Sequence, residues 1–349
     1  MEIYYIILFI IFLFSTLDGF KGQHYSKQLF YFTIVFLIFF VGIRFQVGND
    51  YNAYYFNYLG INSDGSTDSK EILYVLLNRI LSFEGVIFFF SLLSFYFLPK
   101  SIRYFNPDYS NTALLIYFSF FLVTFNIHII RQGLAIAIVL YSYKYFFEKK
   151  YYIYIALVLL AAGFHLSALI VLPVSYFFKF NFKKKTQIIL LLSSVVISFN
   201  ASKLIDLYYT IANNIPILNK YLLFYRQEES WQYTFSFGML FDILVLLFLM
   251  RKSEKFSEKQ TFLYKIFYIS VILSLLLVVD QAALRLNYYF RVVLILLLPL
   301  LIGQFRVKLA VRLGILLACY LYLYMGFTSI SEYGRGDRNL RYKTIIDKH

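Results

Sequence analysis

Long apolar runs constrain this chain more than any other feature, because they follow one another through nearly all of its 349 residues. A bilayer core of about 30 Å is crossed by roughly 20 helical residues, and most of the runs approach that length. Only 15% of the residues are charged, whereas a soluble domain carries roughly 25%. Backbone polar groups in lipid must pair within the chain, which favours helices. The pattern predicts an all-α, polytopic integral membrane protein.

The run 151–178 is too long for one ordinary crossing and contains Gly163, His165 and Pro173. We therefore predict a break at 163–165, which gives about 12 transmembrane segments, some short or broken, with both chain ends outside. The candidate runs lie near 3–20, 28–46, 84–99, 111–127, 129–147, 151–178, 186–199, 235–251, 261–279, 287–304 and 308–327.

The charged residues fall in short loops between these runs and set the predicted orientation. A net charge of +14 would suggest nucleic acid in a soluble protein, but this placement predicts no nucleic-acid partner. Alternate loops on one side carry about twice as many basic residues as those on the other. The positive-inside rule places the lysine-rich loops, such as 179–185 and 251–259, in the cytoplasm. The tail 328–349 adds basic residues on the predicted outer side, against that rule.

We predict a single transmembrane domain over 1–349, with long outer segments at 47–83 and 200–234. Segments of this length in a compact protein are often functional. No removable signal peptide is evident, because the first run lacks a basic start and a small-residue cleavage site. Cys319 is the single cysteine and can form no internal disulfide.

The segment 42–54 places Arg44 at the outer end of a predicted helix, followed by Asp50, Tyr51 and Tyr54. An arginine can hold a phosphate through two parallel hydrogen bonds, which a lysine cannot do. Asp50 can act as a general base or simply hold Arg44. The alternative is an Arg44 that reaches to the membrane surface and an Asp50 that caps the next helix.

The segment 126–132 joins two apolar runs and contains His128 and Arg131. Arg131 begins a predicted helix, where a cation opposes the helix dipole. This position favours a bound anion, either a carboxylate such as Asp50 or a ligand phosphate. An arginine that simply reaches to the membrane surface is the alternative.

His165 lies at the predicted break, between Gly163 and Ser167, on the same predicted side as Arg44 and Arg131. An imidazole titrates near neutrality and can serve as base or acid. The alternative is a hydrogen-bonded core histidine without a chemical role.

The segment 280–291 contains Arg285, predicted to open a helix, with Tyr288 and Tyr289 three and four residues further on. This spacing places the two tyrosines on the helical face of Arg285. The alternative to a ligand-binding role is that Asp280 serves only to neutralise Arg285.

These segments share the predicted outer face, and three arginines facing one cavity suggest a polyanionic ligand. The four histidines do not cluster at metal-ligand spacing, and no carboxylate cluster suits a divalent ion. Phosphate-binding and dinucleotide fingerprints are absent from the sequence. We therefore expect no metal and no cofactor.

The ordered set of motifs resembles the EpsG family of Wzy-type polysaccharide polymerases over roughly 40–300. The chain has Phe45 where the family pattern has a tyrosine after the arginine. The residues that carry the resemblance are Gly42-Ile-Arg-Phe, Gly48-Asn-Asp-Tyr51, Tyr54, Arg131-Gln, Ala135, Phe164-His-x-Ser167 and Arg285-x-x-x-Tyr289-Phe.

The resemblance implies a metal-independent glycosyltransferase with a GT-C-like helical bundle in the bacterial cytoplasmic membrane. Such an enzyme joins undecaprenyl-pyrophosphate-linked oligosaccharide repeat units on the outer face, for O-antigen, lipopolysaccharide or capsule. A flippase and a chain-length regulator are expected partners. The implied catalytic residues are His165, Asp50, Arg131 and Arg285. The implied substrate-binding residues are Arg44, Tyr51, Tyr54, His128, Arg226, Tyr288 and Tyr289.

Two other functions use similar residues. A transporter or flippase would move the same lipid-linked sugars, although transporters place their charges near the bilayer midplane. A ligase would transfer the glycan to a different acceptor, and the sequence does not distinguish it from a polymerase. A structural membrane scaffold is the weakest alternative, since it needs no arginines and histidine on a shared face.

Overall fold

The structure is a computed structural model that describes residues 2–19, 24–60, 71–200, 210, 236–277, 281–300, 302, 308–332 and 340–348. These residues form helices without a named strand, which confirms the all-α class. Five of the helices are long and apolar enough to cross a membrane, so this is a membrane protein. The number of crossings and the GT-C-like arrangement stay predictions. The five helices span His24–Gly42, Phe83–Phe105, Pro107–His128, Glu258–Leu276 and Lys308–Thr328.

The chain forms two compact units, and the prediction of a single transmembrane domain is not tested by them. Unit 1 comprises Met1–Pro173 and Val292–His349, and unit 2 comprises Val174–Arg291. The main helices of unit 1 are α1 (Glu2–Ser15), α2 (His24–Gly42), α3 (Tyr51–Tyr58), α4 (Ile72–Ile80), α5 (Phe83–Phe105), α6 (Ser110–Tyr117), α7 (Ile130–Phe147), α8 (Tyr151–Phe164), α16 (Leu294–Leu297) and α18 (Lys308–Glu332).

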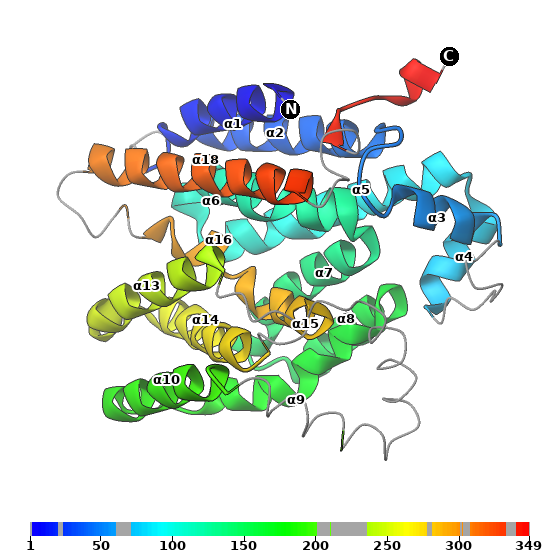
Figure 1. The fold of residues 1–349 in the computed structure, drawn as a ribbon. Coiled ribbons are helices and arrows are strands. Elements are labelled where there is room, and N and C mark those ends of the chain that lie inside the picture. Colours follow the sequence, from blue (N-terminus) through cyan, green and yellow to red (C-terminus); the bar gives the residue numbers. More distant parts are fainter. Residues whose placement is uncertain are drawn as a thin grey trace. The chain divides into compact units, whose positions relative to one another are not determined.

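Helix α7 forms the centre of unit 1, where it packs against α5 and α8 (Figure 1). Every residue from Gln132 to Leu140 is buried, as expected for a helix surrounded by other helices. Gly133 allows a very close approach, because a Cβ atom there would lie 1.9 Å from the carbonyl oxygen of Phe125. The start of α7 is therefore held tightly against the preceding segment.

That preceding segment, η2, is a π-helix over Phe118–His128. Helices of this kind are rare and occur frequently at functional sites. The Tyr117 hydroxyl donates a hydrogen bond of 2.6 Å to Oδ1 of Asn126. The π-helix ends directly before α7, so its last turn sets the position of Arg131 in the first turn of α7.

The predicted break at 163–165 is confirmed. Helix α8 ends at Phe164, and His165 adopts an extended conformation with φ −155° and ψ 112°. A 3-10 helix, η3, follows over Leu166–Ile170. A Cβ atom on Gly163 would lie 2.7 Å from Cδ1 of Leu73, so α4 packs directly against the end of α8.

The end of α2 also receives the C-terminal segment of the chain. The backbone N–H of Phe45 donates to the Lys343 carbonyl, and that of Ile345 donates to the Ile43 carbonyl, both at 2.9 Å. Tyr342 stacks on Phe40 with ring centroids 4.3 Å apart. The C-terminal segment therefore lies at the same end of unit 1 as Arg44, as predicted for a shared side.

The opposite end of unit 1 is closed around Asp18, which is 1% exposed. Its Oδ1 accepts hydrogen bonds from Ser26 Oγ at 2.8 Å and Asn111 Nδ2 at 3.0 Å. Its Oδ2 accepts from the Thr112 backbone N–H at 2.8 Å and the Thr112 hydroxyl at 2.9 Å. We call these four residues the Asp18 cluster. The 19 residues of α2, about 28 Å of helix, separate it from Arg44.

Unit 2 contains α10 (Lys184–Ser198), α13 (Phe237–Lys252), α14 (Glu258–Leu276) and α15 (Gln281–Arg291), with α14 in contact with the other three (Figure 1). The apolar run 287–304 does not form one continuous helix, because α15 ends at Arg291 and the short α16 follows. Pro299 has no N–H to donate and disfavours a helix through this stretch.

Candidate functional site

A tight loop after α2 carries Arg44. Gly48 has φ +112°, and a Cβ atom there would lie 2.4 Å from the Ile127 carbonyl oxygen, so the loop and the π-helix touch. Arg44 is 2% exposed and donates to the carbonyls of Val41 at 2.7 Å, Val47 at 3.3 Å and Ile127 at 3.5 Å. Burial lowers the pKa of Arg44 to about 10, which leaves it charged at neutral pH. These contacts make Arg44 a brace for the loop, and its predicted role in substrate binding is untested.

His128 holds the same loop from the end of the π-helix. Its Nδ1 accepts a hydrogen bond of 2.9 Å from the backbone N–H of Asn49, so its proton is on Nε2. Asp50 follows at the N-terminal end of α3, where its side chain makes no capping hydrogen bond. Tyr51 and Tyr54 are buried on α3. Four residues of the predicted site thus lie around one loop: Asp50, Tyr51, Tyr54 and His128.

The carboxylate of Glu71 joins Arg131 and His165, which were predicted at separate helix ends. Arg131 Nη1 donates to Glu71 Oε2 at 2.6 Å, and His165 Nδ1 lies 2.9 Å from Glu71 Oε1. The side chains of Arg131, Glu71 and His165 are 22%, 13% and 28% exposed, so all three are partly reachable from solvent. We call these three residues the Glu71 cluster. It is assembled from the start of α7, the residue before α4 and the break after α8.

Two tyrosines enclose the Arg131 guanidinium. Its carbon lies 4.8 Å from the ring centroid of Tyr74 and 5.4 Å from that of Tyr54. Burial raises the pKa of Tyr54 to about 12, so its hydroxyl stays protonated at neutral pH. Nε of Arg131 is buried and has no hydrogen-bond partner among the residues that the structure describes. An unsatisfied buried donor costs about 1–3 kcal/mol, which a ligand oxygen can recover.

The Glu71 cluster has the geometry of a base held by a carboxylate. When Nδ1 of neutral His165 donates its proton to Glu71, Nε2 is left as the proton acceptor. The same carboxylate orients Arg131 through its other oxygen. The arrangement therefore sets a proton acceptor beside a guanidinium that can bind an oxyanion.

The remaining predicted residues belong to unit 2 or fall outside the described residues. Arg285 is exposed in the middle of α15 rather than at a helix start, while Tyr289 is buried and Tyr288 is half-buried. Arg285, Tyr288 and Tyr289 belong to unit 2, whereas the Glu71 cluster belongs to unit 1. Arg226 and Asp280 lie outside the described residues. The roles predicted for all these residues stay predictions.

Sequence reasoning did not assign Glu71 a role. It expected either a carboxylate such as Asp50 or a ligand phosphate beside Arg131, and the structure places the carboxylate of Glu71 there. The available signal was an acidic residue at the head of the amphipathic stretch 71–81 on the predicted outer side. A second unassigned pair lies in unit 2, where buried Arg291 and Asp242 join through two hydrogen bonds, Nε to Oδ2 at 2.5 Å and Nη2 to Oδ1 at 3.1 Å.

The model of the EpsG family matches residues 27–344, which include all three residues of the Glu71 cluster. The chain belongs to the EpsG family. No curated protein and no solved structure matches it. Among the described residues, no three His, Cys, Asp or Glu side chains gather as a metal site would require. Membership in the EpsG family supports a polysaccharide-polymerase-like membrane protein, as the motifs indicated.

Proposed function

We propose that this EpsG-family protein is a glycosyltransferase that polymerises oligosaccharide repeat units carried on polyprenyl pyrophosphate. The reaction takes place at the Glu71 cluster, on the side of the membrane opposite the lysine-rich loops. Family membership supports the reaction class, and the cluster supplies the chemical groups that the reaction needs.

One observation carries the proposal: Arg131 and His165 share Glu71 in a partly exposed position, and Nε of Arg131 has no partner among the described residues. An arginine held only for structure would have its donors satisfied by the protein. Here the guanidinium keeps donor capacity for a ligand oxyanion, close to an imidazole that can accept a proton. A pyrophosphate leaving group and a sugar hydroxyl require this combination.

The proposed step moves one glycan and one proton. The hydroxyl oxygen of the acceptor sugar attacks the anomeric carbon of the donor, and its proton passes to Nε2 of His165. The bond from the anomeric carbon to the pyrophosphate oxygen breaks, and the electron pair leaves on that oxygen. Arg131 stabilises the resulting charge, and the imidazolium releases its proton to the departing pyrophosphate or to water. Glu71 keeps the imidazole in the required tautomer.

Two buried tyrosines support the cluster. Tyr54 and Tyr74 pack around the Arg131 guanidinium and hold it in position, and the substrate-binding role of Tyr54 stays a prediction. Arg44 and His128 brace the loop that leads into α3, the helix of Tyr51 and Tyr54. Asp50, at the end of the same loop, is the alternative base, and the catalytic role of Arg285 stays a prediction.

The experiment that tests this function incubates the purified full chain in lipid vesicles with lipid-linked repeat units and a metal chelator. We expect a ladder of lengthened glycans on one lipid carrier, and no ladder with Arg131→Ala. Movement of unchanged substrate between leaflets would identify a flippase instead. Glycan transfer to a lipid acceptor other than the repeat-unit carrier would identify a ligase.

A further inference from the structure

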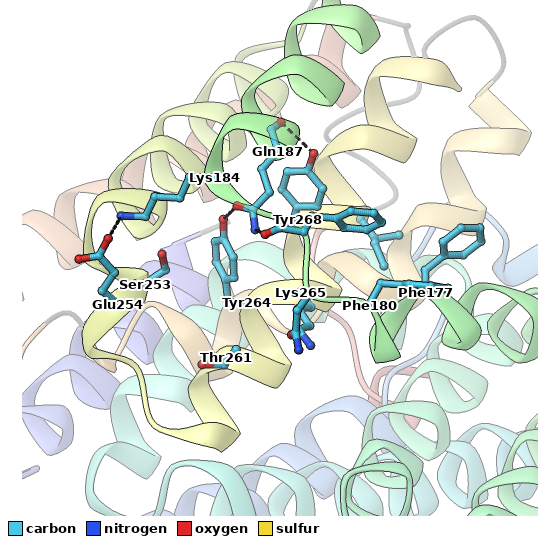
Figure 2. A pocket seen from close by; sticks show the side chains of 13 residues that line it. Phe177, Phe180, Lys184, Gln187, Ser253, Glu254, Thr261, Tyr264, Lys265 and Tyr268 are labelled. Carbon is cyan, nitrogen blue, oxygen red and sulfur yellow. Dashed lines mark hydrogen bonds and ion pairs between the residues drawn. The ribbon is translucent and has the colours of Figure 1, made fainter.

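Unit 2 contains a cavity of about 200 Å³ (Figure 2). Its walls come from the chain between η4 (Tyr176–Lys179) and α10, from η5 (Ser253–Lys255) and from one face of α14. The loops 179–185 and 251–259 around it are the lysine-rich loops predicted to face the cytoplasm. The cavity therefore opens at the predicted cytoplasmic surface of the membrane.

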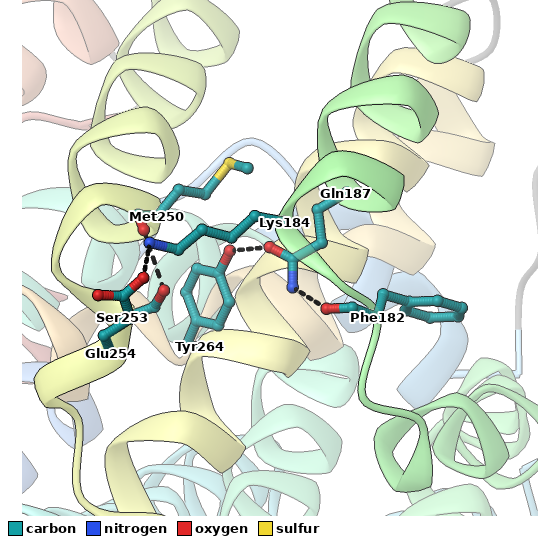
Figure 3. Close-up of polar contacts among 7 residues, drawn as sticks. All are labelled: Phe182, Lys184, Gln187, Met250, Ser253, Glu254 and Tyr264. Atoms are coloured by element: carbon teal, nitrogen blue, oxygen red, sulfur yellow. Dashed lines mark hydrogen bonds and ion pairs between the residues drawn. The ribbon is translucent and has the colours of Figure 1, made fainter.

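A hydrogen-bonded frame shapes this cavity. Gln187 accepts from the Tyr264 hydroxyl at 2.6 Å and donates to the Phe182 carbonyl at 3.0 Å, as Figure 3 shows. The Tyr268 hydroxyl donates to the backbone carbonyl of Gln187 at 2.9 Å. These bonds join α10 to α14 and hold the two aromatic side chains at the cavity wall. The cavity is thus a built feature of unit 2 and not a gap between loose side chains.

Two lysines line the cavity, and they differ in their partners. Lys184 pairs with Glu254 at 2.6 Å, so the acidic residue of the wall is already neutralised (Figure 3). Lys265 is half-buried on α14 and donates to the Phe178 carbonyl at 3.3 Å. Within the described part of the chain, Lys265 forms no ion pair. A partly buried ammonium without a counterion is unfavourable, so this wall favours an anionic ligand.

The surroundings fit the surface of a bilayer. Phe177, Phe180 and Phe182 line the cavity and are between 37% and 51% exposed. Exposed phenylalanines next to basic residues suit the boundary between lipid headgroups and acyl chains. The adjacent loops 179–185 and 251–259 contain eight basic and two acidic residues. Basic pockets on the cytoplasmic side of membrane proteins bind anionic lipid headgroups.

We propose that this cavity binds the phosphate headgroup of an anionic phospholipid in the predicted cytoplasmic leaflet. The ammonium of Lys265 contacts the phosphate oxygens, the Thr261 hydroxyl lies on the same wall, and the aromatic edge contacts the glycerol and upper acyl chains. This site lies in unit 2, and the proposal does not depend on the polymerase reaction.

The test is native mass spectrometry of the purified full chain, titrated with phosphatidylglycerol, with phosphatidylcholine of the same acyl chains, and with glycerol 3-phosphate. We expect the wild-type chain to bind phosphatidylglycerol about tenfold more tightly than phosphatidylcholine, because the choline cation cancels the headgroup charge and is repelled by Lys265. Lys265→Met and Lys265→Gln should both lose that preference, and Lys265→Arg should keep it. Lys255→Met is the matched control, because Lys255 is exposed in the neighbouring basic loop 251–259 and does not line the cavity.

Three results would overturn the proposal. In the first, Lys265→Met or Lys265→Gln keeps the wild-type preference for phosphatidylglycerol. In the second, Lys255→Met loses as much preference as Lys265→Met, which would indicate a diffuse attraction to the basic loops. In the third, glycerol 3-phosphate binds as tightly as phosphatidylglycerol, which would make the cavity a site for free phosphate esters.

Discussion

Asp18 and Glu71 are carboxylates at opposite ends of unit 1, and their surroundings differ. Asp18 is 1% exposed and accepts four hydrogen bonds from neutral donors. Glu71 is partly exposed and is shared by a guanidinium and an imidazole. Burial raises the pKa of Asp18 above its usual value, although its four hydrogen bonds act in the opposite direction. The first carboxylate is saturated by the protein, whereas the second joins two groups that can still act on a ligand.

The difference separates a group that holds the fold from a group that can work on a substrate. Three of the four hydrogen bonds come from α6, 93 or 94 residues further along the chain, and the fourth comes from Ser26 of α2, so Asp18 joins these two helices. At the other end, Arg131 retains a buried N–H without a partner among the described residues. Such a deficit lowers stability and is retained where function requires it. Substitutions in the two clusters should therefore affect different measurements.

The largest expected effect is on turnover, from Arg131→Ala. We expect polymerisation to slow about a thousandfold, because a preorganised charge at the leaving group contributes a large share of catalysis. Arg131→Lys should recover little, since an ammonium lacks the planar fork of donors. The rate is measured from the glycan ladder over time, and stability from a thermal melt in detergent. Arg79→Ala, an exposed arginine on α4, is the control and should keep normal turnover.

The complementary effect is on stability, from Asp18→Ala. Its four donors would lose their acceptor in a buried place, which should lower the free energy of unfolding by about 3 kcal/mol. Turnover per folded molecule should stay close to the wild-type value. Asp108→Ala removes an exposed carboxylate near the start of α6 and should change stability little. A melt unchanged by Asp18→Ala would contradict the assignment of this cluster to the fold.

The third effect concerns the proposed base. His165→Ala should slow polymerisation about a hundredfold, which is typical of the loss of a general base. Added imidazole should restore part of the rate, because the base then enters from solution. A structural histidine would not respond to added imidazole. His24→Ala provides the control, because His24 is exposed at the first residue of α2, at the end of that helix away from Arg44.

The sequence could predict those features that depend on local pattern. The apolar runs indicated a helical membrane protein, and Gly163 with Pro173 in an overlong run indicated the break after α8. The cation at a helix start correctly indicated that Arg131 needs an anion. These predictions succeed because helix formation and termination depend on neighbouring residues.

The sequence could not predict which side chains meet across the fold. Glu71 joins Arg131 across 60 residues and His165 across 94, and nothing in the local spacing distinguishes it from Asp50. Glu71 meets Arg131 and His165 because α4 packs on α8 through Leu73 and Gly163. The π-helix likewise depends on packing around Asn126 and Gly133. Such contacts arise from tertiary structure, which a single sequence does not display.

The smallest expected effect, about tenfold, is also the most informative about Glu71. Glu71→Gln keeps the shape of the side chain and removes its charge. Turnover should fall about tenfold, because an amide holds the imidazole tautomer less firmly than a carboxylate. The KM for lipid-linked substrate should fall as well, since Arg131 is then no longer neutralised and attracts pyrophosphate more strongly. Stability should change little, in contrast to substitution of Asp18.

The direction of KM decides between two roles for Glu71. A carboxylate that only tethers α4 would, once neutralised, loosen the outer segment, and KM would rise together with the loss of turnover. A carboxylate that competes with the substrate for Arg131 gives opposite changes, with weaker turnover but tighter binding. Comparison with Arg131→Ala sharpens the result, because Glu71→Gln in that background should leave KM unchanged if the two charges act on each other. An additive effect of the two substitutions would show that Glu71 acts on substrate binding independently of Arg131.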